Sequence, residues 1–511
     1  MALALEMKGI SKYFASTDVK ANDSVDFAVE AGEVHALVGE NGAGKTTLMS
    51  ILYGLVKPEA GEIKVDGQPV QIHRPDDAIR HGIGMVHQHF KLVPSFTVAQ
   101  SIMLGMEPNR GGFLTPNEEN RIVSELAERH GLPVDPKARI RDLPVGMQQR
   151  VEILKVLERK ARILVLDEPT AVLTPQEVAE LMRVVRNLSQ AGFTVIFITH
   201  KLLEVVRVAD RVTVMRGGRN VGSKAVAETT VPELARMMVG REVLLKVNKA
   251  PRQPGPVVFA ADDVSVTDVR GFPAVTRVSF EVRAGEIVGI AGVSGNGQTE
   301  LVEAVTGMRA LDGGRLALNA KDATSLSVRQ RRNAGLAHIP EDRIHVGLNL
   351  ETNLDENLIV SRYKLGQFNR AGFLNRRSMR DFAIDVIKRF SIAAAVPGGG
   401  ISRLSGGNMQ KVVIGRELAG EPTFIVANQP TRGLDVGSIE FVHRSLVEAR
   451  DRGAGVLLVS VELEEILALS DRVLVMYRGQ IQGEVDPTTA TEEQIGLLMA
   501  GAQPETTAPT A

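Results

Sequence analysis

The stretch "AGEVHALVGENGAGKTTL", residues 31–48, joins an apolar run to a glycine-rich loop and the start of a helical pattern. The same layout returns at residues 284–301 as "AGEIVGIAGVSGNGQTEL", 253 positions further along the chain. Later, "DRVTVMRGG" at Asp210 returns as "DRVLVMYRG" at Asp471, 261 positions away, so the second half carries a net insertion of eight residues. A repeat this long indicates a duplicated domain, because solenoid repeats have periods of roughly 20–50 residues.

The duplication predicts two domains, at residues 1–245 and 257–502. Between them "KVNKAPRQPGP", residues 246–256, has the proline content of a short, stiff linker. Residues 503–511 have the composition of a disordered tail. Within each half, continuous apolar runs such as "VHALVG" and "TVIFITH" alternate with helical patterns, which favours strands buried on both faces of a parallel sheet. We therefore expect two tandem α/β domains, with ligands beyond the carboxyl ends of the strands.

Composition excludes several classes of protein. The net charge of −1 over 511 residues gives no field that would hold nucleic acid. The absence of cysteine excludes disulfides and Cys-ligated metals. No stretch approaches the roughly 18 apolar residues of a membrane span, and "MALALEMKGI" does not read as a signal peptide. A soluble, cytoplasmic chain is expected.

The loop "GENGAGKT", residues 39–46, matches the phosphate-loop pattern with both its lysine and its hydroxyl. Its glycines let backbone N–H groups close around phosphates, Lys45 neutralises their charge, and Thr46 can ligate Mg²⁺. A chance glycine turn is the alternative, and the strand–loop–helix context argues against it. The residues predicted to bind ATP here are Gly39, Glu40, Asn41, Gly42, Ala43, Gly44, Lys45, Thr46 and Thr47.

A second apolar strand, in "ILVLDEPT", ends in two acids. Asp167 can hold Mg²⁺ through water, and Glu168 is placed to activate an attacking water. Two such acids can also belong to a solvated loop, but four apolar residues precede them and Pro-Thr follows. Gln88 in "MVHQHF" and His200 in "FITHKL" carry little weight alone, since a lone histidine is more often an ordinary side chain.

These motifs, with "LSGGNMQK" at residues 404–411 and "LPVGMQQR" at residues 143–150, together resemble the ATP-binding cassette, the motor of ABC transporters. The resemblance covers nearly the whole chain. It implies two P-loop NTPase domains, each with a helical signature subdomain and an antiparallel β part. It also makes Gln88 the loop glutamine that senses Mg²⁺ and the membrane partner, and His200 the switch histidine near the γ-phosphate. Phe14 would stack on adenine, with Tyr13 or simple core packing of Phe14 as alternatives.

In this family two cassettes bind head to tail, so each ATP lies between the phosphate loop of one and the signature loop of the other. What we call site one then joins the phosphate-loop side of the first half to the signature of the second. Asn408 is its departure from the family pattern, where glutamine is commoner. The resemblance assigns to site one Lys45, Thr46, Gln88, Asp167, Glu168 and His200 with Ser405, Gly406 and Gly407.

Site two, the remaining pocket, has lost the residues that carry chemistry. By the two offsets, Lys45 corresponds to Gln298, Gln88 to Glu341, Asp167 to Asn428, Glu168 to Gln429 and His200 to Val461. The signature copy facing it has Pro144 in place of serine, while Gly292, Gly295, Gly297 and Thr299 remain. We expect a degenerate site, kept for nucleotide binding or domain closure, with little or no hydrolysis. A tight glycine turn explains the glycines alone but leaves Asn428 and Gln429 unexplained.

Fused twin cassettes without membrane spans resemble the ATPase subunit of bacterial importers for nucleosides and monosaccharides. "GIGMVHQHFKLVP" and "NQPTRGLDVGSIEF" resemble the nucleoside group, and "AHIPEDR" is shared with sugar importers. The resemblance implies ATP and Mg²⁺, a peripheral place on the cytoplasmic membrane face, two permease subunits and a substrate-binding protein. It implies no nucleic acid and no direct contact with the solute.

Two alternatives remain: a ribose- or galactose-type importer, and a soluble twin-cassette ATPase acting on ribosomes. The short linker and Gln429 argue against the second. The permease surface is expected at residues 89–102, where at least one of Phe90, Leu92 and Phe96 would be core.

Overall fold

The computed structural model describes residues 2–15, 19–87, 90–110, 113–170, 173, 175–240, 249–293, 295–393, 395–499 and 501. The chain divides into two compact units, Met1–Val243 and Leu244–Ala511. Gln88, the start of the expected linker and residues 503–511 lie outside the described residues. Within the described part of the chain, no helix combines the length and apolar character that crossing a membrane requires.

The elements of the first unit are, in chain order, β1 (Leu3–Phe14), β2 (Val19–Glu30), β3 (Val34–Gly39), α1 (Lys45–Leu52), β4 (Ala60–Val65), β5 (Gln68–Val70), α2 (Pro75–Arg80), β6 (Ile83–Val86), α3 (Val98–Met103), β7 (Asn109–Arg110), β8 (Phe113–Leu114), α4 (Pro116–His130), η1 (Ile140–Asp142), α5 (Val145–Glu158), β9 (Ile163–Asp167), α6 (Pro175–Gln190), β10 (Thr194–Ile198), α7 (Leu202–Val208), β11 (Arg211–Arg216), β12 (Arg219–Ala225), η2 (Val226–Glu228) and α8 (Val231–Val239).

The elements of the second unit are β13 (Val257–Thr267), β14 (Pro273–Arg283), β15 (Ile287–Ala291), α9 (Gln298–Thr306), β16 (Gly313–Leu318), β17 (Lys321–Asp322), α10 (Val328–Asn333), β18 (Leu336–Ile339), the π-helical turn η3 (Arg343–Gly347), α11 (Leu354–Ile359), β19 (Asn369–Arg370), β20 (Phe373–Leu374), α12 (Arg376–Arg389), η4 (Ile401–Arg403), α13 (Gly406–Leu418), β21 (Phe424–Asn428), α14 (Val436–Asp451), β22 (Gly455–Ser460), α15 (Leu463–Leu469), β23 (Arg472–Tyr477), β24 (Gln480–Val485) and α16 (Glu492–Met499).

The first unit is built on a six-stranded sheet in the order β12-β11-β3-β10-β9-β6. All its pairs are parallel except β11 with β12. Every residue of β3, β9 and β10 is buried, as expected for apolar strands covered on both faces. A second, antiparallel sheet runs β2-β1-β4-β5, and α1 lies between the two sheets, where Leu48 and Met49 share one core with Leu5 and Val165. This packing places the start of α1 at the carboxyl edge of β3.

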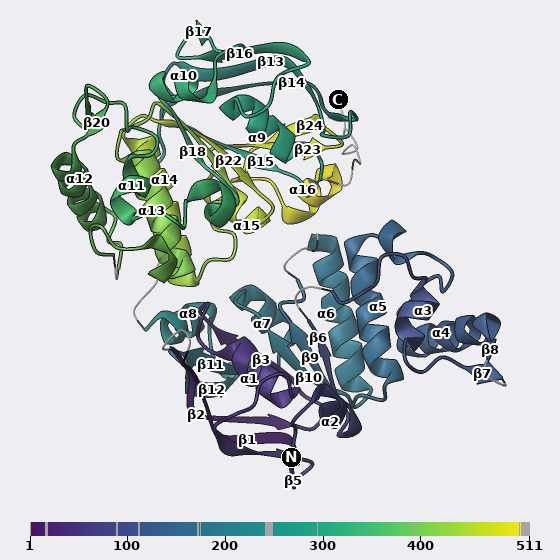
Figure 1. Ribbon diagram of the computed structural model, residues 1–511. Helices are drawn as coiled ribbons and strands as arrows, with labels where there is room; N and C mark the ends of the chain where they lie inside the picture. Colours follow the sequence, from purple (N-terminus) through teal and green to yellow (C-terminus); the bar gives the residue numbers. More distant parts are fainter. Residues whose placement is uncertain are drawn as a thin grey trace. The chain divides into compact units, whose positions relative to one another are not determined.

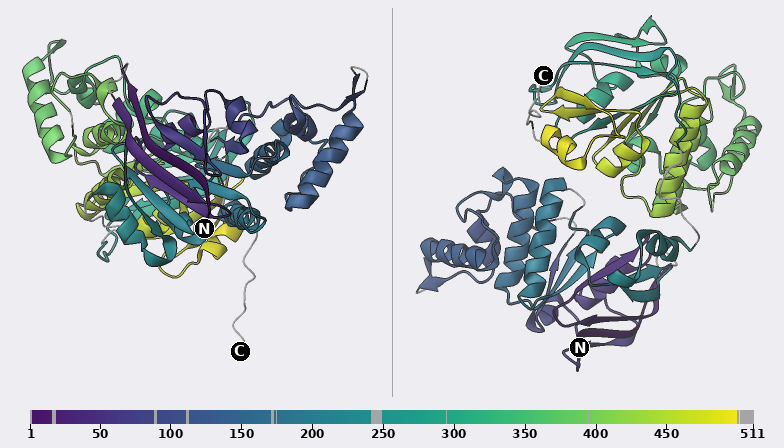
Figure 2. Two further views of the ribbon diagram at one scale, coloured as in Figure 1. Left: turned by 90° about the horizontal axis from the view of Figure 1, so that it is seen from below. Right: turned by 180° about the vertical axis from the view of Figure 1, so that it is seen from behind.

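A helical part projects from this sheet core (Figure 1). It consists of α3, α4 and the start of α5, with the short hairpin β7–β8 at its tip, and Figure 2 shows it from two further sides. Local chemistry sets the ends of α4, because Pro116 occupies its first turn and Gly131 ends it at a φ of 65°. The signature copy "LPVGMQQR" forms the start of α5, whose N-cap is Pro144.

The second unit repeats the first. Its main sheet, read from the other edge, is β24-β23-β15-β22-β21-β18, and its antiparallel sheet is β14-β13-β16-β17. The helices α11, α12 and the start of α13 form the helical part, with β19–β20 at its tip (Figure 1). The predicted fold class, two P-loop domains each with a helical subdomain and an antiparallel sheet, is confirmed.

The insertion in the second half begins in the loop after β18. Strands β6 and β18 start at Ile83 and Leu336, which keeps the offset of 253 residues. The N-caps of the next helices, Thr97 and Asn353, are 256 apart, so three of the eight extra residues lie in this loop. The longer loop contains η3, the π-helical turn Arg343–Gly347. The other five extra residues follow in the helical part.

The described end of the proline-rich stretch is attached to the second unit. The Nζ of Lys249 donates to the carbonyl oxygen of Ser470 at 2.5 Å and lies 2.8 Å from the Asp471 carboxylate. The carbonyl oxygen of Ala250 accepts from Arg450 Nη2 at 3.0 Å. These bonds hold this segment against the edge of its own unit.

Candidate functional site

The phosphate loop of the first unit wraps around the ammonium of Lys45. Helix α1 begins at Lys45 directly after Gly44, whose φ is 94°. A Cβ at Gly44 would lie 2.1 Å from the carbonyl oxygen of Ala21, so only glycine fits there. The Nζ of Lys45 donates to the carbonyl oxygens of Gly39 at 2.7 Å and Glu40 at 3.0 Å. The loop therefore holds a buried cation at the N-terminus of an eight-residue helix.

Acids at the end of β9 face this cation. Burial lowers the pKa of Lys45, and the charges of Glu168 and Asp167 oppose that shift. Burial and the neighbouring Glu168 raise the pKa of Asp167 to about 6, while Lys45 lowers it. A buried carboxyl group whose ionisation is penalised in this way suits a bound cation, which would restore the charged form.

Glu168 is held in an unusual backbone conformation with a histidine against its carboxylate. Its φ is 46°, and its backbone N–H donates to the carbonyl oxygen of Ile198 at 3.0 Å. The Nδ1 of His200 lies 3.2 Å from Glu168 Oε1, and this hydrogen bond is the main cause that lowers the pKa of Glu168. An ionised carboxylate fixed at the edge of the sheet has the chemistry of a general base. Thus β9 and β10 bring together Asp167, Glu168 and His200 as the sequence predicts.

The first unit suits Mg²⁺ only together with a phosphate ligand. Among the described residues, no group of three or more His, Cys, Asp or Glu side chains could hold a metal. Mg²⁺ usually takes one or two carboxylates plus phosphate oxygens and water. Asp167 and the exposed Thr46 at the start of α1 fit that donor set. Gln88, the third expected metal residue, lies outside the described part of the chain.

The second unit keeps the backbone of a phosphate loop. Gly295 and Gly297 have φ values of 88° and 98°, against 82° and 94° for Gly42 and Gly44. A Cβ at Gly297 would lie 2.1 Å from the carbonyl oxygen of Ala274, which repeats the contact at Gly44. This loop is therefore a structural copy of the first, and α9 begins directly after it.

Neutral side chains occupy the positions of the charged ones in this copy. Gln298 is 8% exposed, and its Nε2 donates to the carbonyl oxygen of Val293 at 3.1 Å, much as Lys45 bonds its own loop. Gln429 has a φ of 48°, and its Oε1 accepts from the backbone N–H of Val461 at 3.3 Å. Asn428 ends β21 as Asp167 ends β9. The second unit thus keeps the backbone shape of the first. The neutral side chains of Asn428 and Gln429, however, do not fit a magnesium site.

The two signature copies differ at their N-caps. In the second unit Ser405 caps α13, and its hydroxyl accepts from the backbone N–H of Asn408 at 3.4 Å and from its Nδ2 at 3.0 Å. The Oδ1 of Asn408 accepts from the backbone of Ala393 at 3.0 Å, so this departure from the family pattern supports the loop. A Cβ at Gly407 would lie 2.2 Å from Ser438 Oγ. Pro144 caps α5 with a φ of −55° and no side-chain hydrogen bond.

The aromatic candidates for stacking on adenine lie at the end of β1. Phe14 is half-buried, and Lys12 Nζ lies 5.5 Å from the centre of its ring. Tyr13 is 41% exposed. Phe14 is thus not fully buried, and its stacking on adenine stays a prediction.

The expected permease surface is less buried than predicted. Phe90, Leu92 and Phe96 are all half-buried, so the prediction that at least one is core is wrong. The physical reason is that Val98 and Ala99, at the start of α3, fill the buried positions instead. His89 lies outside the described residues.

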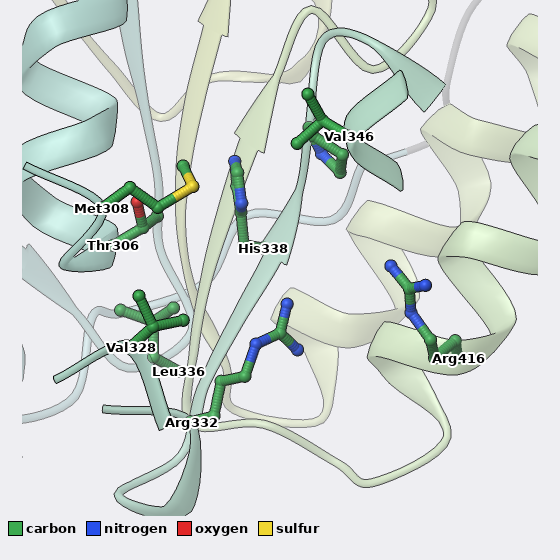
Figure 3. A pocket seen from close by; sticks show the side chains of 9 residues that line it. Thr306, Met308, Val328, Arg332, Leu336, His338, Val346 and Arg416 are labelled. Carbon is green, nitrogen blue, oxygen red and sulfur yellow. The ribbon is translucent and has the colours of Figure 1, made fainter. Parts of the chain in front are cut away.

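Sequence reasoning missed a pocket of about 100 Å³ in the second unit. Figure 3 shows His338 among its lining residues, with Met308, Val346, Arg332 and Arg416 around it. Burial lowers the pKa of His338 to about 4, and its buried Nε2 has no hydrogen-bond partner among the described residues. The only signal in the sequence was the segment "AHIPEDR", in which this histidine is the second residue.

Two P-loop domains, one with a charged site and one with a neutral copy, define a twin-cassette nucleoside triphosphatase. The family model described as "ABC transporter" matches residues 22–171 and 275–432. The chain belongs to the ABC transporter family, as an ATP-binding, ATP-hydrolysing subunit with both cassettes in one polypeptide.

Relatives similar over nearly the full length are import proteins. A guanosine import ATP-binding protein of Bacillus subtilis is 48% identical, with 98% of each chain covered. A nucleoside import ATP-binding protein of Lactococcus lactis is 47% identical, covering 97% of this chain and 98% of its own. A glucose import ATP-binding protein of Haloferax volcanii is 43% identical, covering 97% and 96%. Among solved structures, an archaeal ribosome recycling factor covers 94% of this chain and 90% of its own at a TM-score of 0.62. Its identity is 19%, so it shows the fold alone.

Proposed function

We propose that this chain is the ATP-hydrolysing subunit of an importer that takes up nucleosides. The observation that supports this most is the similarity over the whole chain to two proteins named for guanosine and nucleoside import. The relative named for glucose import is less similar over the same length. Uptake of a monosaccharide is the second candidate, and that relative is the observation in its favour.

ATP is bound and cleaved in site one. Lys45 and the backbone N–H groups of the phosphate loop hold the β- and γ-phosphates of ATP. Thr46 and Asp167 would hold Mg²⁺. Bound Mg²⁺ offsets the negative charge of the phosphates. Glu168, kept ionised by His200, orients the attacking water and takes its proton. Gln88 would contact the metal from the loop after β6, and Phe14 would stack on the adenine.

Site one is completed by the signature of the second unit. Ser405, Gly406 and Gly407 lie at the start of α13, where the backbone N–H groups of a first turn and the helix dipole favour an anion. Site two pairs the neutral loop of Gln298 with Pro144 and supports little hydrolysis. Asn428, Gln429 and Gln298 replace the two carboxylates and the ammonium that carry the chemistry of site one, so the two sites have unequal roles.

The partners we propose are two membrane permeases and a substrate-binding protein. The chain sits on the cytoplasmic face of the membrane and passes the energy of hydrolysis to the permeases. The solute crosses through the permeases and does not touch this chain. The segment at residues 89–102, which follows Gln88 in the chain, is the proposed contact.

Uptake assays test the substrate and the class of protein together. The chain and its permeases are produced in cells, and entry of labelled guanosine is compared with that of ribose. We expect ATP-dependent guanosine uptake that the Glu168→Gln variant abolishes. Ribose uptake with no guanosine uptake would favour the sugar importer. Copurification with ribosomes and not with membrane proteins would contradict both.

A further inference from the structure

The segment "AHIPEDR", residues 337–343, ends in an arginine that has no role in site one as proposed above. Arg343 is the first residue of the π-helical turn η3. The carboxylate of Asp342 fixes this turn, because its Oδ1 accepts from the backbone N–H groups of Ile344 and His345, both at 2.9 Å. Arg343 therefore leaves the loop after β18 at a set position.

The guanidinium of Arg343 lies beside the signature loop of its own unit. A Cβ at Gly406 would lie 3.1 Å from Arg343 Nη2 and 3.6 Å from Nε. On its other side, Nη1 donates to the carbonyl oxygen of Arg432 at 2.8 Å and Nη2 to that of Gly433 at 3.4 Å. Arg343 thus bridges the loop after β21 and the first residue of α13.

This cation forms no ion pair with any of the described residues. The Asp342 carboxylate already binds the backbone of η3 and the His345 ring, whose Nδ1 lies 2.8 Å from it. The neighbouring Glu341 forms an ion pair with Arg432. The buried Nε of Arg343 has no hydrogen-bond partner in the described part of the chain. Burial lowers the pKa of Arg343, and the charge of Asp342 only partly opposes that shift. A partly buried guanidinium without an ion-pair partner in its own unit is suited to bind an anion from outside that unit.

The loop after β6 in the first unit contains no arginine, since residues 87–96 read "HQHFKLVPSF". The offset that relates Pro144 to Ser405 places Ala171 at Arg432. The arginine is therefore present on the unit whose signature has its serine, and absent from the unit whose signature has Pro144. In the proposed head-to-tail pairing, Arg343 therefore belongs to the same site as Lys45 and Ser405.

We infer that Arg343 contacts the γ-phosphate of the ATP held by Lys45, alongside Ser405. The inference rests on the proposed head-to-tail pairing of the two units. A guanidinium offers planar, charge-assisted hydrogen bonds to phosphate oxygens, and arginine is suited to this because it stays charged even when partly buried. Arg343 then adds the positive charge that reaches the phosphates from the signature side of site one.

A purely structural role makes a different prediction. If Arg343 only clamps the carbonyl oxygens of Arg432 and Gly433, a neutral donor should serve as well as a charged one. Arg343→Gln keeps N–H donors without charge, whereas Arg343→Lys keeps the charge. A phosphate contact requires the lysine variant to retain more function than the glutamine variant.

The test measures binding of ATP and ADP, each with Mg²⁺, to the full chain assembled with its permeases. All variants carry Glu168→Gln so that ATP is not consumed. We expect Arg343→Ala to weaken ATP binding roughly 10- to 100-fold and ADP binding less than about threefold, because ADP has no γ-phosphate. Arg432→Ala is the matched control, since it removes an arginine that Glu341 already neutralises, and it should change ATP binding less than about threefold.

Three results would overturn the inference: equal losses for ATP and ADP, no loss of ATP binding, or a glutamine variant at least as good as the lysine variant. Ser405→Ala, measured in parallel, separates this from the proposed pairing. If Ser405→Ala weakens ATP binding and Arg343→Ala does not, the inference on Arg343 alone is wrong. If neither variant weakens ATP binding, the head-to-tail pairing itself fails.

Discussion

Replacing Ser405 by alanine tests the pairing of two residues that lie in different halves of the chain. Ser405 caps α13, and its hydroxyl accepts two hydrogen bonds from Asn408. As a donor, that hydroxyl remains available to a phosphate oxygen. In the proposed site one it meets the γ-phosphate held by Lys45.

The expected size of the effect follows from the kind of bond. A hydrogen bond to a charged group contributes about 1.5–3 kcal/mol, so Ser405→Ala should slow ATP turnover roughly 10- to 150-fold. Loss of the N-cap adds a separate destabilisation of about 1 kcal/mol. Ser405→Gly separates the two effects, because glycine at an N-cap costs only a few tenths of a kcal/mol.

The assay is ATP hydrolysis at saturating nucleotide in the transporter assembled with its permeases. Ser405→Gly should lose nearly as much turnover as Ser405→Ala, with an unfolding midpoint near that of the wild type. Pro144→Ala is the matched control in the other signature. It removes no phosphate contact, so it should change turnover less than about threefold.

Two results would contradict this pairing. Equal sensitivity at Ser405 and Pro144 would mean that both sites hydrolyse ATP. A harmless Ser405→Ala beside a strongly impaired Pro144→Ala would mean that the units do not pair head to tail.

Three further predictions concern the base, the permease surface and the buried histidine. Glu168→Gln should reduce turnover by orders of magnitude while ATP binding persists, and Gln429→Glu should raise turnover less than about twofold, both measured by phosphate release. Phe96 is half-buried, so part of its side chain can contact a permease. Phe96→Asp should therefore uncouple solute uptake from hydrolysis and leave basal ATP hydrolysis unchanged. Loss of solubility in this variant would instead indicate a core role. Since burial lowers the pKa of His338 to about 4, the unfolded chain binds a proton below about pH 6.5 that the folded unit excludes. The free energy of unfolding of the second unit should therefore fall by about 2 kcal/mol from pH 7 to pH 5, and His338→Gln should remove that fall in urea unfolding followed by circular dichroism.

The sequence predicts the phosphate loops well because their glycines are required by the backbone. Gly44 and Gly297 both leave no room for a Cβ, so the spacing of the glycines along the chain is enough to specify the turn. The strand ends at Asp167 and Asn428 are predicted for a similar reason, since an apolar run that stops at a polar residue marks the carboxyl edge of a parallel sheet.

Side-chain contacts between loops are harder to predict. Nothing in "AHIPEDR" indicates that Arg343 lies beside Gly406, because the two are 63 positions apart and the π-helical turn that begins at Arg343 depends on Asp342. The burial of Phe90 and Phe96 also failed as a prediction, since their segment is irregular and has no periodicity that would assign a buried face.

Hydrolysis of ATP in only one of the two cassette sites is the claim on which the proposed function depends. It can be measured by counting the phosphate released per chain in the first turnover, after ATP is mixed with the assembled transporter in excess of its sites. We predict one phosphate per chain, lost in Glu168→Gln and unchanged in Gln429→Glu. Two phosphates per chain, or one that persists in Glu168→Gln, would contradict a single hydrolytic site.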